Sequence, residues 1–164
     1  VEELPPKSLK KLGEAFGGPL LEQLKAQGLA GADSVLTPSA SPGWFEQRAW
    51  VWLHYGATKL ARGELFEAMG MLAFFRDEVL GPMLHRRAGR LQRGVRRIET
   101  LDGPSVAQLG RTVASLDADS LRDAFLVAAD MYLDLRADDP PSRMTGSMPE
   151  AIRQYLNSKS RASG

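Results

Sequence analysis

Residues 44–80, WFEQRAWVWLHYGATKLARGELFEAMGMLAFFRDEVL, decide the fold of this chain. Their apolar positions recur with the spacing of one helical face, in two successive stripes. The first stripe is Phe45, Ala49, Trp52, Leu53, Ala57 and Leu60, and the second is Leu65, Met69, Leu72, Phe75 and Val79. Gly63 separates the stripes, and Pro82 is expected to kink or end the second helix. So short a connection predicts two long helices packed antiparallel.

Apolar residues keep helical spacing beyond Gly89. Helical spacing covers residues 91–101, 105–116, 117–136 and 148–157. No segment alternates apolar and polar residues convincingly, as a half-buried strand does, and no repeat shows a fixed period. The sequence therefore predicts an all-α fold, an up-and-down helical bundle with an irregular N-terminal arm.

Proline usage divides the chain. Residues 1–43 hold five of the ten prolines, with two short helical patterns at 8–16 and 19–28 between the breaks. We therefore predict an N-terminal arm and linker over residues 1–43 and a helical bundle domain over 44–158. A flexible polar tail is expected at 159–164.

Composition excludes several classes of site. The chain has 164 residues, with 21 basic and 20 acidic side chains and a net charge of +1, which argues against nucleic acid as a partner of the whole surface. Cysteine is absent, which rules out disulfides and thiolate chemistry, and the two histidines lack metal-motif spacing, so no metal site is predicted. Without an apolar run of about 18 residues or a signal pattern, a cytoplasmic location away from the membrane is expected.

The polar side of the first long helix carries the strongest candidate site. It presents His54, Tyr55 and Lys59, and the last two lie one turn apart on the same face. A phenol and an ammonium placed this way are donors that hold a phosphate or a carboxylate. The alternative is structural, with Lys59 solvated and Tyr55 half-buried in the bundle.

Two carboxylates follow in the first turn of the second helix. Glu64 and Glu67 are favoured there by the helix dipole, which is sufficient to explain them. They are also weak candidates for a catalytic general base. Spacing alone leaves both interpretations open.

A basic cluster lies between Glu78 and Glu99. It consists of Arg86, Arg87, Arg90, Arg93, Arg96 and Arg97. Nucleic-acid binding is one interpretation, but no aromatic residue from 77 to 123 is present to stack on a base. Pairing with an acidic row on a neighbouring helix is favoured instead. That row is Asp123, Asp130, Asp134 and Asp138, while Asp117 and Asp119 open their helix and are expected to cap it.

Several short motifs that follow one another within residues 44–100 carry a resemblance to a known protein family. They are His-Tyr-x-x-x-Lys at 54–59, Arg-Gly-Glu-Leu-x-Glu-Ala at 62–68, the long helix through 72–80, and Gly-Val-Arg-Arg-Ile-Glu at 94–99. Together they resemble the helical C-terminal region of bacterial nucleotidyltransferases related to the aminoglycoside and lincosamide resistance enzymes.

The resemblance implies a nucleotide- and substrate-lid domain that is not catalytic alone. In that family a separate sheet carries the Gly-Ser turn and the metal-binding aspartates, and this chain has neither, so whether it is an enzyme stays open. Lys59 would contact the triphosphate, with Tyr55 and His54 beside it. The chain alone would hold no cofactor, whereas pairing with a separate catalytic domain would bring Mg²⁺ and a nucleoside triphosphate. A homo-oligomer is left open.

Two other functions compete with this one. The first is a helical module that recognises a protein or a small ligand. The second is a ribonuclease of the HEPN type, for which Arg48 and His54 have the loose spacing that such sites show. Ala49 stands against the ribonuclease, because those sites usually carry a polar residue next to the arginine.

Overall fold

The computed structural model describes residues 40–160. The chain divides into two units, residues 1–39 and 40–164, and the second contains the described part. The helical patterns at 8–16 and 19–28 therefore lie outside the described residues. The predicted boundaries after residues 43 and 158 stay predictions.

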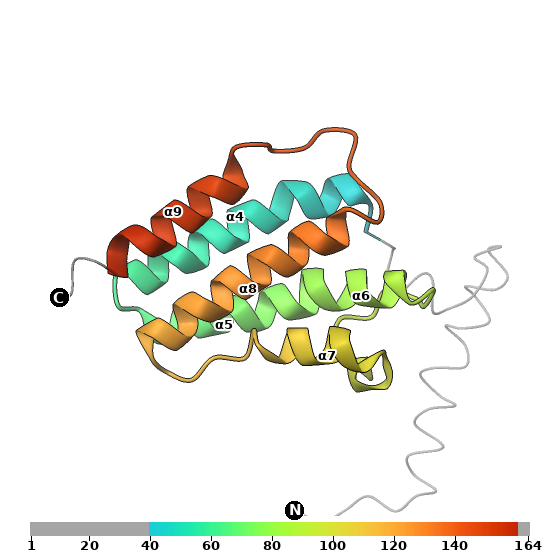
Figure 1. Ribbon diagram of the computed structural model, residues 1–164, viewed down its shortest axis with the longest axis horizontal. Coiled ribbons are helices and arrows are strands. Elements are labelled where there is room, and N and C mark those ends of the chain that lie inside the picture. Colours follow the sequence, from blue (N-terminus) through green and yellow to red (C-terminus); the bar gives the residue numbers. More distant parts are fainter. Residues whose placement is uncertain (1–39, 161–164) are drawn as a thin grey trace, which may run out of the picture. The chain divides into compact units, whose positions relative to one another are not determined.

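The described residues form helices joined by short turns. In chain order they are α4 (Pro42–Ala61), α5 (Leu65–Phe75), η1 (Arg76–Leu80), α6 (Gly81–Arg87), η2 (Ile98–Thr100), α7 (Gly103–Gly110), α8 (Ala118–Arg136) and α9 (Met148–Ser160). α4 runs opposite to the continuous helix from α5 to α6, α8 runs opposite to α9, and α4 and α8 lie side by side (Figure 1). The described part contains no strand, so the predicted all-α class is confirmed.

The two ends of α4 follow from local sequence. Ser41 caps the first turn by accepting a hydrogen bond from the Trp44 backbone N–H at 3.2 Å, so the helix begins earlier than predicted. At the other end Gly63 adopts a φ of 74°. The Gly63 N–H donates to the Leu60 carbonyl and the Glu64 N–H to the Lys59 carbonyl, both at 3.0 Å, which is the Schellman pattern. The role predicted for Gly63 is confirmed.

The second helix does not end at Pro82. It continues from α5 through the π-helical segment η1 into α6 and stops after Arg87. In η1 the Gly81 N–H donates to the Arg76 carbonyl, five residues back. This wider turn lets the helix accommodate a proline ring that would clash with regular α-helical spacing.

Residues 91–101 are not the helix that their spacing predicted. They form turns that end in the single 3₁₀ turn η2, because three left-handed residues interrupt the segment: Gly89, Gly94 and Arg97, with φ of 66°, 56° and 55°. The Gly94 backbone lies so close to Gly81 that a methyl group added at Gly81 would overlap the Gly94 carbonyl. The Val95 N–H donates to Asp77 Oδ1 at 3.2 Å, which fixes the segment on the helix.

The core is formed by facing stripes of α4, α5, α8 and α9. Its largest fully buried side chains include Tyr132, Phe45, Phe75 and Phe125. Asp117 accepts a hydrogen bond from the Ser120 N–H at 2.8 Å and caps α8, as predicted. By contrast α7 ends at Gly110, several residues before the predicted end at 116. Among the helices between residues 40 and 160, none has the length and apolar content to cross a membrane.

Candidate functional site

The residues predicted for the first long helix do come together, at the turn between α4 and α5. Lys59 Nζ lies 2.7 Å from Glu64 Oε2, and the Tyr55 hydroxyl donates to Glu67 Oε2 at 3.0 Å. The Lys59 ammonium also stands 5.3 Å from the centre of the Tyr55 ring. The hydrogen bond raises the pKa of Lys59 and lowers that of Glu64. The donors are therefore already paired with carboxylates.

The other predicted residues have separate partners. The His54 ring lies 5.9 Å from that of Tyr155, and the Arg48 guanidinium sits 4.5 Å above the Trp44 ring. The nucleotide contacts assigned to His54, Tyr55 and Lys59 stay predictions. The role of catalytic general base for Glu64 or Glu67 stays a prediction as well.

An apolar groove opens beside this turn. It has a volume of about 430 Å³ and is lined by Tyr55, Phe66, Glu67, Gly70, Met71 and Phe74. Phe66 is 78% exposed and Phe74 43% exposed, which is unusual for phenylalanine on one continuous surface. We call this surface the Phe66 groove.

A buried carboxylate that sequence reasoning missed lies at the opposite end of α4. Glu46 is 3% exposed and accepts hydrogen bonds from four groups. They are Trp50 Nε1 at 3.0 Å, the Tyr132 hydroxyl at 2.5 Å, Arg136 Nη1 at 3.0 Å and the Thr145 N–H at 2.8 Å. Burial would raise the pKa of Glu46, but the hydrogen bonds from Tyr132, Thr145, Trp50 and Arg136 outweigh it and lower that pKa. All its acceptor positions are used, so its role is structural.

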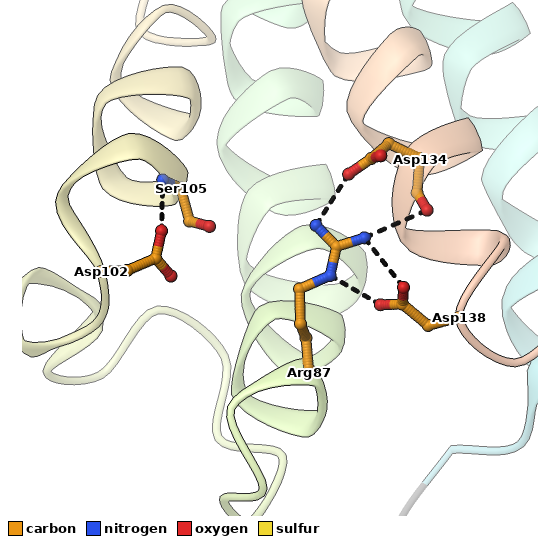
Figure 2. Close-up of polar contacts among 5 residues, drawn as sticks. All are labelled: Arg87, Asp102, Ser105, Asp134 and Asp138. Atoms are coloured by element: carbon orange, nitrogen blue, oxygen red, sulfur yellow. Dashed lines mark hydrogen bonds and ion pairs between the residues drawn. The ribbon is translucent and has the colours of Figure 1, made fainter.

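The predicted pairing of arginines with an acidic row is confirmed for Arg87. Its guanidinium donates to Asp134 Oδ2 at 2.7 Å and to Asp138 Oδ2 at 2.6 Å, as Figure 2 shows. Asp138 and Asp134 together raise the pKa of Arg87. Figure 2 also shows Asp102, which accepts from the Ser105 N–H at 2.9 Å and caps α7. The ion pair between Arg87 and Asp134 joins α6 to α8.

Arg86 lies 3.3 Å from Asp139, and the other four arginines of the cluster surround a cavity. This arginine pocket, of about 260 Å³, is lined by His85, Arg90, Leu91, Arg93, Arg96 and Arg97. The left-handed residues Gly94 and Arg97 turn the segment so that its side chains meet around His85. His85 itself is 3% exposed, and neither of its ring nitrogens has a hydrogen-bond partner. The arginines form the wall of a cavity because the segment that carries them is not helical.

No group of three or more potential metal ligands occurs in the described part of the chain.

Comparisons with known proteins match part of this chain to subunits of a tRNA ligase. The chain is 74% identical over 42 residues to the glycine–tRNA ligase beta subunits of Leptothrix cholodnii and Polaromonas naphthalenivorans, and 71% identical to that of Acidovorax sp.. Each match covers 26% of this chain and 6% of the relative, so the chain accounts for a small part of those proteins. No protein-family model matches the chain. No solved structure matches it significantly.

These relatives correct the predicted resemblance. They are glycine–tRNA ligase beta subunits, not nucleotidyltransferases of the aminoglycoside type, so the resemblance and the lid function derived from it are wrong. The helical interaction module and the HEPN-type ribonuclease do not fit the relatives either.

The partner expected from the resemblance is also wrong. Relatives that are subunits of a tRNA ligase give no support to a separate nucleotidyltransferase catalytic domain as the partner of this chain. Nucleotide binding as a general property is likewise unsupported.

Proposed function

We propose that this chain serves glycine–tRNA ligation as an accessory component that associates with the ligase, in the cytoplasm. The observation that carries the proposal is the match itself. Identities of 64–74% over 42 or 43 residues recur across beta subunits from different bacteria. A stretch this similar is expected to keep the contacts that it makes in the relatives. Because it represents 6% of a beta subunit, the chain is not proposed to ligate glycine by itself.

The partner that follows is the alpha subunit of such a ligase. A beta subunit belongs by its name to an enzyme with another kind of subunit. The Phe66 groove supports association, since exposed aromatic residues around a concave apolar surface are typical of sites that another protein covers. We assign the groove to the alpha subunit.

Calorimetric titration of the purified chain into a purified bacterial glycine–tRNA ligase alpha subunit tests this proposal. We expect saturable binding with a Kd in the micromolar range or tighter. Phe66→Ser should weaken it at least tenfold, because a residue that is 78% exposed contributes to a complex and not to the fold. Val113→Ser is the matched control, since Val113 is 64% exposed and lies outside the groove. The proposal would be refuted if the titration gave no heat of binding and the two proteins did not co-elute from a column at saturating alpha subunit.

A further inference from the structure

Within residues 40–160, the charges of Arg90, Arg96 and Arg97 in the arginine pocket have no carboxylate partner. No carboxylate is found among its described lining residues. Arg96 and Arg97 make no ion pair within residues 40–160, in contrast to Arg87 with its two aspartates. Arg90 is held by Thr100, donating to its hydroxyl at 2.7 Å and its carbonyl at 3.2 Å, and these neutral acceptors leave its charge in place. Cations gathered without a counter-charge repel one another, and an anion between them relieves that repulsion.

His85 is the second, independent feature of the pocket. Its imidazole is almost fully buried and lines the cavity, and neither ring nitrogen makes a hydrogen bond of ordinary geometry, although the Arg96 backbone lies close to the ring. Buried polar atoms are nearly always hydrogen-bonded, and an exception indicates a missing ligand or a functional role. Burial lowers the pKa of His85, the nearby backbone of Arg96 opposes this, and the charges of Arg90 and Arg93 lower it further. A neutral imidazole still offers one N–H donor to an anion.

We propose that the arginine pocket is a binding site for a phosphate group, held by Arg90, Arg96 and Arg97 and by the imidazole of His85. Guanidinium groups donate in a planar fork that matches phosphate oxygens, which makes arginine the preferred side chain for this anion. The cavity, about 260 Å³, lies below the usual size of a pocket for a whole drug-sized ligand, which is roughly 300–1,000 Å³. A phosphate group fits such a space better than an entire nucleotide.

The phosphate could belong to a free phosphorylated compound or to an RNA backbone. The described residues 77–123 contain no aromatic side chain that could stack on a base, so the pocket recognises the phosphate and not the base. This inference does not depend on the association proposed above, because it concerns a site within the bundle alone.

The two histidines of the chain permit a test with an internal control. Nitrogen-15 NMR of the full-length chain follows both imidazoles during titration with inorganic phosphate at constant ionic strength, with chloride as the balancing salt. His54 is exposed on α4 and outside the pocket, and His54→Gln assigns the remaining signal to His85. We expect a saturable shift of the His85 signals with a millimolar Kd or tighter, and no matching shift of His54. Equal, non-saturating shifts of both rings, or the same His85 shift with chloride alone, would overturn the proposal.

A variant pair examines the arginines directly. Arg96→Gln combined with Arg97→Asn removes two cations, and asparagine tolerates the left-handed backbone at position 97, where φ is 55°. We expect phosphate affinity to fall at least tenfold. Arg62→Gln, at a residue whose side chain is 69% exposed at the end of α4, is the control and should bind as the parent does. Unchanged affinity in the double variant would contradict the assignment.

A second titration, with bacterial transfer RNA, identifies the source of the phosphate. If RNA shifts the His85 signals at lower concentrations than inorganic phosphate does, and the double variant loses this response, the site is for the RNA backbone. If inorganic phosphate alone shifts them, the site is for a free phosphorylated compound. Both results support a phosphate site, whereas a His85 ring that responds to neither anion refutes it. Binding to the alpha subunit is measured separately, so the two proposals can fail independently.

Discussion

Glu46 shows how much a single buried side chain can contribute to this fold. Its carboxylate joins α4 to α8 through Tyr132 and Arg136 and to the segment before α9 through the Thr145 N–H. Each of these groups is a donor that points at a carboxylate oxygen. Removing one partner from a buried, hydrogen-bonded charge network leaves the others unsatisfied, and that costs more than the network contributes as a whole.

Glu46→Gln is therefore expected to lower the free energy of unfolding by about 3 kcal/mol. Glutamine has one acceptor oxygen, and its amide would face donors where the carboxylate now accepts. Chemical denaturation followed by circular dichroism measures the change. Glu150→Gln, at an exposed position on α9, is the matched control and should change stability by less than about 0.5 kcal/mol. Equal stability of the two variants would show that the network contributes nothing.

The same network predicts a pH dependence. The pKa of Glu46 lies below its ordinary value of 4.5, so the folded state binds this proton less readily than the unfolded chain. The stabilisation is complete above that value and is lost as the pH falls through the lowered pKa. The stability difference between the parent and Glu46→Gln should thus be constant from about pH 7 to pH 5 and shrink below about pH 4. A difference that grows on acidification would contradict the assigned direction.

At this scale the sequence predicted one contact between near neighbours and one pairing of distant charges, that of the arginine cluster with the acidic row, which Arg87 makes. Tyr55 and Lys59 were placed on one face from helical spacing, and the structure brings the Lys59 ammonium to 5.3 Å from the Tyr55 ring. Their contacts with Glu67 and Glu64 across the turn were not predicted. Glu46 could not be identified, because its partners Tyr132 and Thr145 lie 86 and 99 residues away. His85 was assigned no role for the same reason, since its environment depends on how residues 88–97 fold back.

The elements show which local signals are reliable. Gly63 and Asp117 mark helix ends through local caps, so the end of α4 and the start of α8 were predicted from sequence. The cap at Ser41 was missed, because residues 37–43 were interpreted as a linker. The segment after α6 was not predicted either, because its path depends on contact between Gly81 and Gly94. Helical spacing persists there by coincidence, and two glycines and Arg97 in left-handed conformation override it.

A pair of glycine variants separates these effects. Gly81→Ala should destabilise the chain by about 2 kcal/mol, because a methyl group overlaps the Gly94 backbone, which has little freedom to move. Gly70→Ala, also within a helix but with no atom near the added methyl group, should stabilise it by about 1 kcal/mol. Thermal unfolding of both variants measures whether each substitution raises or lowers the stability of the chain. A neutral Gly81→Ala would mean that the segment is not held against α6.

Whole-molecule architecture could be predicted more readily than function. Apolar periodicity and turn residues are sufficient for an all-α, up-and-down bundle, since packing depends on where apolar side chains lie and less on their identity. Function depends on a few side chains whose neighbours come from distant sequence, and helix pairs of this kind occur in unrelated proteins. The resemblance to nucleotidyltransferases is contradicted by the relatives, which are glycine–tRNA ligase beta subunits.

Competition with a genuine beta subunit is the most direct test of the proposed role in glycine–tRNA ligation. A ligase assembled from its alpha and beta subunits is assayed for charging of transfer RNA with glycine while the purified chain is added in increasing excess. If the chain occupies alpha-subunit surface that the beta subunit also uses, charging should fall in a saturable manner, added beta subunit should restore it, and Phe66→Ser should inhibit at least tenfold more weakly. Charging that stays constant at a hundredfold excess of the chain would contradict the proposal.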